Sequence, residues 1–439
     1  MSAEVETLLD APWSIPSSWK WSRMGQMSTV ITGGTPSTLD RVNFEGGTIP
    51  WITPADLSGF SEKIISCGAR SITQRGLDNS GAQLIPKWSV IFSSRAPIGY
   101  VAIAGCQLTT NQGCKSFALG LALTSEYVYY YLQRAKGLAL KMASGTTFLE
   151  LSKKSAESLP IPLAPLPEQR RIVEAIEANF ARLEAGVAAL ERVRRTLRQH
   201  RASLWKSACE GKLGGTWGSW PQAGIFDATD DLDGLRVPVN ATEREGRPRK
   251  VPYYGATGQV GWIDKHLFDE ELVLLGEDGV DFFDYLKPKA YVINGPSWVN
   301  NHAHVLRCRP EKILAKFLEV QLNAANYSGL ANGTTRLKLT KSAMRQIPIL
   351  LPSISIQRKV VDEVERRLSV ASQVESVIGE DHARAGKLRE SILQRAFEGS
   401  LVPQDPNDEP ASALLERIKH ERSSPSQSMT RNRKAVRAS

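Results

Sequence analysis

Residues Gly145–Arg170 read GTTFLELSKKSAESLPIPLAPLPEQR, and residues Gly333–Arg358 read GTTRLKLTKSAMRQIPILLPSISIQR, 188 positions further along the chain. The two stretches keep one register from the Gly-Thr-Thr triplet to the Gln-Arg pair. The echo continues beyond them, since Ser203, Ala208, Glu210, Gly211 and Leu213 are matched by Ser391, Ala396, Glu398, Gly399 and Leu401. The chain therefore contains one long sequence pattern twice.

A repeat of this length indicates two copies of a whole module. Solenoid repeats are much shorter, with periods up to about 50 residues. Two copies of a module predict a pseudo-two-fold axis in the folded molecule. Proteins with such an axis suit targets that are themselves two-fold, of which duplex DNA is the commonest.

Composition and charge indicate a soluble globular protein with a polyanionic partner. The 439 residues leave room for roughly three domains at about 150 residues each, and 41% hydrophobic with 23% charged residues is ordinary. The net charge is +9, which favours nucleic acid. Five scattered cysteines argue against a disulfide framework and a zinc site. The acidic N-terminus is unlike a signal peptide, and no apolar run reaches the ~20 residues that span a bilayer, so we expect a cytoplasmic protein without membrane contact.

The repeat and the changes of composition divide the chain into six segments. Gly- and Pro-punctuated β-type runs predict mixed domains, for example at 89–92 and 272–275. The fold class is α+β, with two globular domains joined by two long antiparallel helices. The predicted segments are a loose N-terminal arm (1–18), mixed domain 1 (19–158), a strap and long helix 1 (159–215), mixed domain 2 (216–346), a strap and long helix 2 (347–401), and a C-terminal tail (402–439) whose last part is disordered.

Each strap leads into a long helix. Four prolines among nine residues from Leu159 lack an N–H and predict an extended strap without hydrogen-bonded structure. Heptad spacing predicts helices over about 168–209 and 356–397, which pack as a coiled coil. In the second helix Glu375 and His382 interrupt one seam position. The residues predicted to pack are Val173, Ile176, Phe180, Leu183, Val187, Leu190, Leu197, Val364, Ala371, Ile378, Ala385 and Ile392.

Sequence motifs for catalysis are missing. The chain has no Gly-x4-Gly-Lys-Ser/Thr loop for a nucleoside triphosphate, no Asn/Asp-Pro-Pro-Tyr/Phe tetrapeptide for amino methylation, and no dinucleotide-binding glycine motif. Asp56 with Glu62 and Lys63 has the wrong spacing for a nuclease. His302 and His304 lack further ligands at metal-site spacing. We therefore predict no catalytic residues, no metal and no cofactor in this chain. It would bind and position its target, while other proteins catalyse the reaction.

Candidate DNA contacts occur in both mixed domains. In the first, a hydroxyl-rich loop can contact phosphate, an arginine that ends an apolar strand can read guanine O6/N7, and two amides can pair with adenine. In the second, four basic residues are followed closely in the sequence by two aromatic residues. An Asn-Asn-His segment there resembles the amide pair of the first domain. The candidates are Thr35, Ser94, Arg95, Asn111, Gln112, Arg244, Arg247, Arg249, Lys250, Tyr253, Tyr254, Asn301 and His302.

The repeated Gly-Thr-Thr triplets, each with a lysine nearby, leave two readings open. They are either architecture or sequence-independent contacts to the DNA backbone. Because they repeat, they cannot encode a difference between the two domains. The mixed segments differ strongly in sequence, so two different DNA sequences would be read there. The basic tail after 422 is solvated or touches DNA.

The whole pattern resembles the specificity subunit of type I restriction–modification systems, over about residues 16–420. The segments that carry the resemblance are the strap from Leu159 with Leu166-Pro-Glu-Gln-Arg, Pro50-Trp-Ile-Thr-Pro-Ala-Asp-Leu, Leu275-Gly-Glu-Asp-Gly, and Arg395-Ala-Phe-Glu-Gly-x-Leu-Val-Pro-Gln-Asp-Pro-Asn-Asp-Glu-Pro-Ala-Ser. No single one of these motifs would suffice.

The resemblance implies a division of labour among subunits. Each domain would read one half of a split site in double-stranded DNA, and the helices would set the separation of the halves. Two modification subunits carrying S-adenosylmethionine would dock on the helices and methylate adenine. Two restriction subunits would add ATP- and magnesium-dependent translocation and cleavage, and the specificity subunit itself would have no catalytic residues.

Two alternatives remain at this point. The chain could be a self-contained DNA methyltransferase or nuclease, although the motifs for the cofactor are missing. It could also be a coiled-coil scaffold that serves only protein partners and does not bind DNA.

Overall fold

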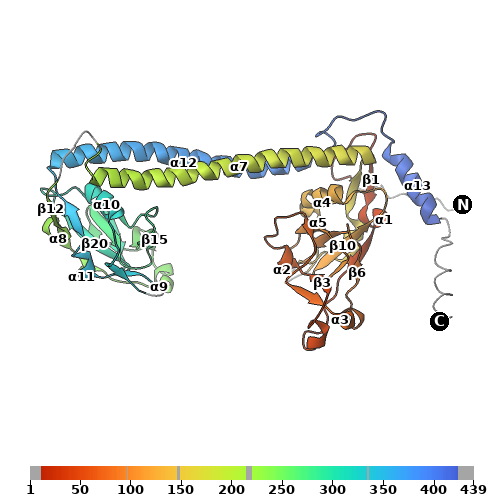
Figure 1. Cartoon of the computed structure of the whole chain (residues 1–439), viewed down its shortest axis with the longest axis horizontal. Coiled ribbons are helices and arrows are strands. Elements are labelled where there is room, and N and C mark those ends of the chain that lie inside the picture. The colour runs from red at the N-terminus through yellow and green to blue at the C-terminus, as the bar shows by residue number, and fades with distance from the viewer. Residues whose placement is uncertain (1–10, 96, 146–148, 214–219, 334–335, 424–439) are drawn as a thin grey trace. The chain divides into compact units, whose positions relative to one another are not determined.

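The computed structural model describes residues 11–95, 97–145, 149–213, 220–333 and 336–423. The chain divides into two compact units, one of Met1–Gly186 with Arg384–Ser439 and one of Val187–Ala383. Two 44-residue helices, α7 (Leu166–Cys209) and α12 (Ile354–Phe397), contribute a part to each unit. Each unit thus holds one mixed domain and a pair of helix segments (Figure 1). We call the mixed domains domain 1 and domain 2, in chain order.

Domain 1 contains two sheets. Their strand orders are β2-β10-β7-β8-β4 and β5-β3-β9-β6. The first sheet comprises β2 (Ser28–Thr32), β10 (Cys114–Leu119), β7 (Val90–Ser93), β8 (Val101–Ala104) and β4 (Ile64–Ile65). The second comprises β5 (Arg70–Ile72), β3 (Ile49–Ile52), β9 (Leu108–Thr110) and β6 (Leu84–Ile85). The helices of unit 1 besides α7 and α12 are α1 (Met24–Met27), α2 (Pro54–Leu57), α3 (Gln74–Asp78), α4 (Ser125–Arg134), α5 (Lys136–Met142), α6 (Lys153–Ser158) and α13 (Ala411–Ser423), with a 3-10 turn η1 (Arg41–Asn43).

Domain 2 has the same sheet plan, except that no strand among its described residues corresponds to β4. Its orders are β13-β20-β17-β18 and β15-β14-β19-β16. The strands are β13 (Thr229–Asp231), β20 (Ala303–Cys308), β17 (Leu272–Gly276), β18 (Ala290–Ile293), β15 (Gly258–Ile263), β14 (Val251–Gly255), β19 (Pro296–Val299) and β16 (Phe268–Asp269), with a short pair β21 (Ala331–Asn332) and β22 (Lys338–Leu339). The helices are α8 (Ile225–Ala228), α9 (Ala241–Glu245), α10 (Ala315–Ala324) and α11 (Lys341–Met344), with a 3-10 turn η2 (Asp233–Leu235).

The internal repeat therefore extends through the mixed domains, although their sequences differ. In domain 1 the parallel pair β3 and β9 places Trp51 opposite Thr109. In domain 2 the parallel pair β14 and β19 places Tyr253 opposite Trp298. The antiparallel pairs β7–β10 and β17–β20 likewise correspond. The predicted α+β class is confirmed, and the two domains are two versions of one fold.

The prediction that the first strap lacks hydrogen-bonded structure is wrong. Pro160–Leu163 forms strand β11, which pairs antiparallel with β1 (Lys20–Arg23). Within this strand the prolines stand at 160 and 162, so Ile161 and Leu163 keep their N–H groups on the edge that faces β1. On the other edge, the carbonyls of Pro160 and Pro162 accept hydrogen bonds from the hydroxyls of Tyr131 and Tyr127.

The second strap is paired in the same way. Strand β23 (Pro348–Leu350) lies antiparallel to β12 (Gln222–Gly224). Its outer edge is closed by the side-chain amide of Gln321, which accepts from the N–H of Leu350 at 2.6 Å and donates to its carbonyl at 3.0 Å. Each strap is therefore extended and forms a two-stranded pair with a neighbouring strand. The extended conformation was predicted correctly, and the pairing was not predicted.

The N-terminal arm is packed where it is described. The indole of Trp13 donates to the carbonyl of Phe397 at 2.8 Å, and its ring meets Trp21 edge-on at 5.0 Å. The prediction of a loose arm is therefore wrong for residues 11–18. The short helix predicted at 411–420 is confirmed as α13, while the predicted disordered end lies almost wholly outside the described residues.

The helices α7 and α12 run antiparallel within each unit. In unit 2, Glu191 faces His382 at 4.0 Å and Arg201 faces Glu375 at 3.4 Å, so rising numbers on α7 meet falling numbers on α12. In unit 1, the guanidinium of Arg389 lies 4.1 Å from the ring centre of Phe180. The seam-breaking Glu375 and His382 thus have polar partners on α7.

The predicted seam residues are all at least half-buried. Those buried are Ile176, Phe180, Val364, Ala371, Ile378 and Ile392, and those half-buried are Val173, Leu183, Val187, Leu190, Leu197 and Ala385. Each helix ends before a glycine with positive φ, Gly211 (+67°) and Gly399 (+73°), which fits the C-terminal position where glycine is preferred. No helix in the described part of the chain is long and apolar enough to cross a bilayer.

Near its start, each long helix is fixed to its domain by one buried glutamine. The Gln169 amide donates to the carbonyls of Ala122 and Ala164 at 2.8 and 2.9 Å and accepts from the N–H of Thr124 at 3.1 Å. Gln357 makes the matching three bonds to Lys312, Pro352 and Leu314, at 2.8, 2.9 and 2.9 Å. Thr124 and Leu314 are the N-caps of α4 and α10. Each glutamine therefore ties the helix, the strap and the helix of the domain together.

The start of α7 also holds the segment that follows α12. Glu168 accepts from the indole of Trp19 at 2.9 Å and from the side chain of Gln404. Burial raises the pKa of this carboxyl, against the opposing effect of the two hydrogen bonds. Arg171 and Asp408 form a salt bridge at 2.6 Å. The segment that resembles the C-terminal stretch of the family is thus part of unit 1.

Replacing Gln169 by methionine should destabilise unit 1. The near-isosteric thioether keeps the volume but leaves three buried backbone groups without this partner, at about 1–3 kcal/mol for each group that stays unpaired. We expect the free energy of unfolding, measured in urea, to fall by about 3 kcal/mol. The control is Gln199→Met at an exposed site of α7, where surface changes stay within about 0.5 kcal/mol. Equal effects of the two variants would contradict this role.

Candidate nucleic-acid interface

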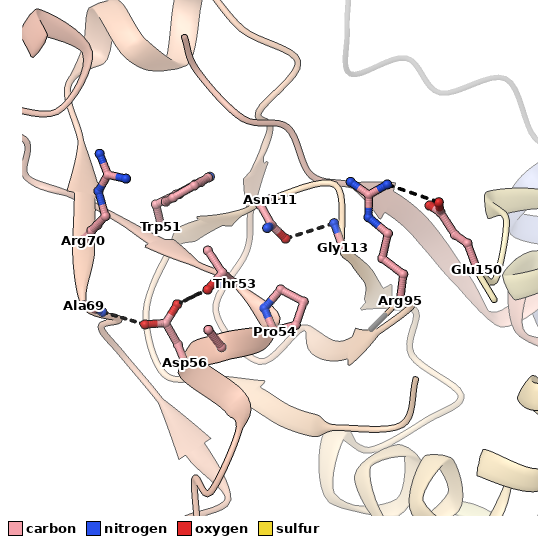
Figure 2. A pocket seen from close by; sticks show the side chains of 11 residues that line it. Trp51, Thr53, Pro54, Asp56, Ala69, Arg70, Arg95, Asn111, Gly113 and Glu150 are labelled. Carbon is pink, nitrogen blue, oxygen red and sulfur yellow. Dashed lines mark hydrogen bonds and ion pairs between the residues drawn. The ribbon is translucent and has the colours of Figure 1, made fainter. Parts of the chain in front are cut away.

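Domain 1 has a cavity of about 760 Å³ at the ends of several strands. Its wall is built from the end of β3 and from α2, from the start of β5, from the turn after β7, and from the turn before β10 (Figure 2). The side chains in this wall that carry charge are Asp56, Arg70, Arg95 and Glu150. Segments distant in sequence thus bring both signs of charge and an amide, Asn111, to one hollow.

Asp56 is the structural anchor of this cavity. Its carboxylate accepts from the N–H and hydroxyl of Thr53 at 2.8 and 2.6 Å and from the N–H of Ala69 at 2.7 Å. Burial pushes the pKa of Asp56 upward, but the hydrogen bonds outweigh it and hold the pKa below its ordinary value. Lys63 bonds to Glu177 instead. The rejected nuclease assembly of Asp56, Glu62 and Lys63 therefore has no basis in the geometry.

An aromatic and cationic group forms another part of the wall. The guanidinium of Arg70 lies 4.0 Å from the ring centre of Phe44 and 5.8 Å from that of Trp51. The Trp51 indole donates to the carbonyl of Gly34 at 2.9 Å, which fixes its ring. Sequence reasoning missed Arg70 as a site residue. The only indication of a role for Arg70 was that it lies on the strand next to the one that carries the Pro50-Trp-Ile-Thr motif.

Two of the five candidates of domain 1 lie in the wall of this cavity, and two others form a pair beside them in the sequence or through a hydrogen bond. Arg95 and Asn111 line it. Gln112 follows Asn111 directly and is bonded to the hydroxyl of Thr35. Ser94 is fully buried and accepts from Lys115 at 3.1 Å, so its side chain is part of the core and the prediction of a DNA contact there is not supported by its position.

Lys115 is a buried cation that sequence reasoning missed. Its ammonium lies 3.5 Å from the Glu150 carboxylate, and its side chain is 3% exposed. Burial lowers the pKa of Lys115, while the negative charge of Glu150 opposes that shift. A lysine inside the apolar strand Cys114–Leu119 was the available signal. This lysine neutralises the carboxylate of Glu150 in the wall of the cavity.

The basic cluster of domain 2 is only partly available to a ligand. Arg244 stacks on the Tyr253 ring at 4.2 Å, and Arg247 forms ion pairs with Glu243 and with Asp264. Arg249 and Lys250 are exposed. Within the described residues, these two are the members of the predicted cluster that face solvent without an ion pair.

The two aromatic candidates of domain 2 are packing residues. Tyr253 is 1% exposed, and its hydroxyl bonds to the backbone of Val239. Tyr254 is half-buried against Tyr291, with ring centres 6.1 Å apart. A direct DNA contact by Tyr253 is incompatible with this burial. Alternation of inward and outward residues along β14, which the sequence alone did not orient, decides this outcome.

The predicted correspondence of the two amide segments is confirmed. Asn111 accepts from the N–H of Gly113 at 2.9 Å and donates its own N–H to Ile52 at 2.9 Å. Asn300 accepts from the N–H of His302 at 2.8 Å and donates to Tyr254 at 3.1 Å. Asn301 is exposed, and His302 bonds to Asp278 at 2.8 Å. The same turn therefore precedes β10 and β20.

Comparison with known proteins identifies the family. Residues 16–192 and 240–369, together more than half of the chain, match the model of the type I restriction modification DNA specificity domain. The chain belongs to this family. Over 169 residues it is 38% identical to the type I restriction enzyme MjaIX specificity subunit of Methanocaldococcus jannaschii, which covers 38% of each chain. Over 319 residues it is 23% identical to the EcoKI specificity subunit of Escherichia coli K12, covering 64% of this chain and 68% of the relative.

A solved structure has the same fold. A chain from a study of complex assembly and conformational transition in a type I R-M system is 19% identical, with a TM-score of 0.64 over 89% of this chain and 100% of that chain. The alignment with the MjaIX subunit spans little more than a third of that relative's length. The family and the fold of the specificity domains are therefore established by comparison.

Specificity domain 2 contains a buried ion network beneath its strand ends. Atoms of Asp233, Glu277 and His304 lie within 4.8 Å of one another, a spacing that could suit a cation. The guanidinium of Arg236 already bonds Glu277 at 2.7 Å and lies 3.4 Å from Asp233. His304 also bonds the carbonyl of Leu339 at 2.8 Å. We interpret the group as a structural network in which Arg236 supplies the positive charge.

Asp56→Asn should weaken specificity domain 1 in a pH-dependent way. The folded state lowers the pKa of Asp56 from 3.8, so its contribution is present above that value and is lost as the pH falls through the lower folded pKa. The difference in free energy of unfolding between wild type and variant should be full at pH 7 and shrink below pH ~4. Urea unfolding at a series of pH values measures it. A difference that is constant or grows in acid would contradict this origin.

Proposed function

We propose that this chain is the sequence-specific DNA-recognition subunit of a type I restriction–modification complex. Domain 1 reads one half of a bipartite site in double-stranded DNA, and domain 2 reads the other. The observation that carries the proposal is the duplicated specificity-domain fold with different side chains at equivalent strand ends. The cavity residues Arg95 and Gly113 in domain 1 have Asp278 and His302 at the matching places in domain 2. One fold with two sets of end residues suits two different half-sites.

The repeated parts of the chain serve partners that are the same on both sides. The long helices set the spacing of the half-sites and dock two modification subunits, and two restriction subunits complete the complex. The chain itself is non-catalytic. S-adenosylmethionine, ATP and magnesium belong to the partner subunits, and the complex works in the cytoplasm.

Affinity and specificity come from different residues in this mechanism. Exposed cations such as Arg249 and Lys250 would contact phosphates and make binding depend on salt. Contacts to base edges in the grooves discriminate at about 1–3 kcal/mol for each good pair. The net charge of +9 agrees with a polyanionic partner.

Mapping of methylated adenine in cells with and without this gene tests the proposal. We expect one bipartite motif to lose its methylation when the gene is deleted and to regain it when the gene is restored. The purified chain alone should neither methylate nor cut DNA, since catalysis resides in the partners. An unchanged methylation map in the deletion strain, or activity of the isolated chain, would refute the proposed function.

A further inference from the structure

The two domains share one detailed site at the strand end that follows β7 or β17. In domain 1, Ser94 donates its N–H to Gly113 at 2.7 Å and accepts from the N–H of Leu151 at 2.9 Å. In domain 2, Glu277 donates to His302 and accepts from Leu339, both at 2.8 Å. Leu151 and Leu339 are matching positions of the sequence repeat. The segment after each Gly-Thr-Thr triplet therefore lies against the same strand end in both domains.

Charges at this site are reversed between the domains. Isolated antiparallel β-bridges of the backbone pair Arg95 with Glu150 in domain 1 and Asp278 with Lys338 in domain 2. These are equivalent positions with opposite signs. In domain 2, the carboxylate of Asp278 binds the guanidinium of Arg336 at 2.7 Å. Each domain thus presents one arginine held by one carboxylate. In domain 1 the arginine follows the strand and the carboxylate follows the Gly-Thr-Thr triplet, whereas in domain 2 the two are exchanged.

We propose that Arg95 and Arg336 are the specificity-determining residues of the two domains and that each reads one guanine of its half-site. This inference rests on the proposed function. Arginine is the side chain that pairs with the O6 and N7 acceptors of guanine through two parallel donors. A carboxylate that holds one nitrogen fixes the fork and leaves other donors free.

The geometry supports such a role for Arg95. One nitrogen, Nη1, contacts Glu150 at 3.3 Å, and the side chain remains 38% exposed in the wall of the cavity. Figure 2 shows its guanidinium joined to Glu150, in the same cavity wall as Asn111 and Gly113. The Oδ1 atom of Asn111 is already bonded to Gly113, which leaves the amino group to face a ligand.

Arg336 lies against the turn after β17. Its side chain is 58% exposed. Gly279, with φ of +70°, lies directly beneath, and a Cβ atom there would come within 2.9 Å of Nη2 of Arg336. The positive φ favours glycine at 279. The glycine also lets the end of the Arg336 side chain lie close to the turn after β17.

Each carboxylate has a second partner besides its arginine. Glu150 lies 3.5 Å from Lys115, and Asp278 lies 2.8 Å from His302. Neither acid therefore depends on its arginine alone for a partner while the arginine presents its free donors to DNA. Exposed ion pairs contribute only about 0–1 kcal/mol to stability, so folding alone does not account for an arginine–carboxylate pair at the same site in both domains.

Modified DNA tests the inference on the wild-type complex. Once the bipartite motif is known, each guanine is replaced singly by 7-deazaguanine, which lacks the N7 acceptor, and binding of the complex with its modification subunits is measured. We expect one guanine in each half-site whose replacement weakens binding about tenfold, since 1.4 kcal/mol lies within the range for one such pair. Half-sites without guanine, or without any sensitive guanine, would overturn the inference.

Two variants assign each guanine to its arginine. Arg95→Gln should abolish the sensitivity in the half-site of domain 1 only, and Arg336→Gln that in the other half-site only. The controls Arg417→Gln and Arg309→Gln remove ion-paired arginines with Glu409 and Asp230, which lie elsewhere in their units, and should keep both sensitivities. Full sensitivity in Arg95→Gln and Arg336→Gln would overturn the assignment. A wild-type complex that recognises no bipartite motif would instead refute the proposed function.

Discussion

The buried glutamine near the start of each long helix is the constraint on which the rest of the structure depends. Gln169 and Gln357 are completely buried, and each satisfies three backbone groups, two from the segment before the domain helix and one from the strap. A buried amide without hydrogen-bond partners would cost free energy. The bonds therefore favour one position of each helix relative to its domain. The same three bonds in both units mean that two different domains are attached to the helices in the same way.

Attachment by an identical clamp allows the strand ends to vary. The sheets of the two domains share their strand order except for the edge strand β4 of domain 1, and they share their turns at Asn111 and Asn300. Above that framework, buried charges differ, with Lys115 in one domain and Arg236 with His304 in the other. Each set is neutralised locally. The chain can therefore carry different exposed residues at its strand ends without changing how each domain is attached to the long helices.

Local patterns in the sequence predicted the elements well and their neighbours poorly. The helices expected at about 168–209 and 356–397 are Leu166–Cys209 and Ile354–Phe397, because heptad spacing and terminal glycines are local signals. The cavity depends on the parallel pairing of Trp51 with Thr109, which joins distant segments and leaves no local trace. For the same reason the sequence could not show that Tyr253 points inward, that the proline strap pairs with β1, or that Glu150 holds Arg95.

A chain with two copies of domain 1 tests the two-reader mechanism most directly. Residues 223–346 are replaced by residues 22–158, at junctions where β1 and β12 and the two straps are in matching register. Methylated adenine is then mapped in cells that carry the partner subunits. The mechanism predicts a palindromic motif, in which the half-site of domain 1 occurs twice, on opposite strands, with the original gap. A motif that retains the second natural half-site would contradict it.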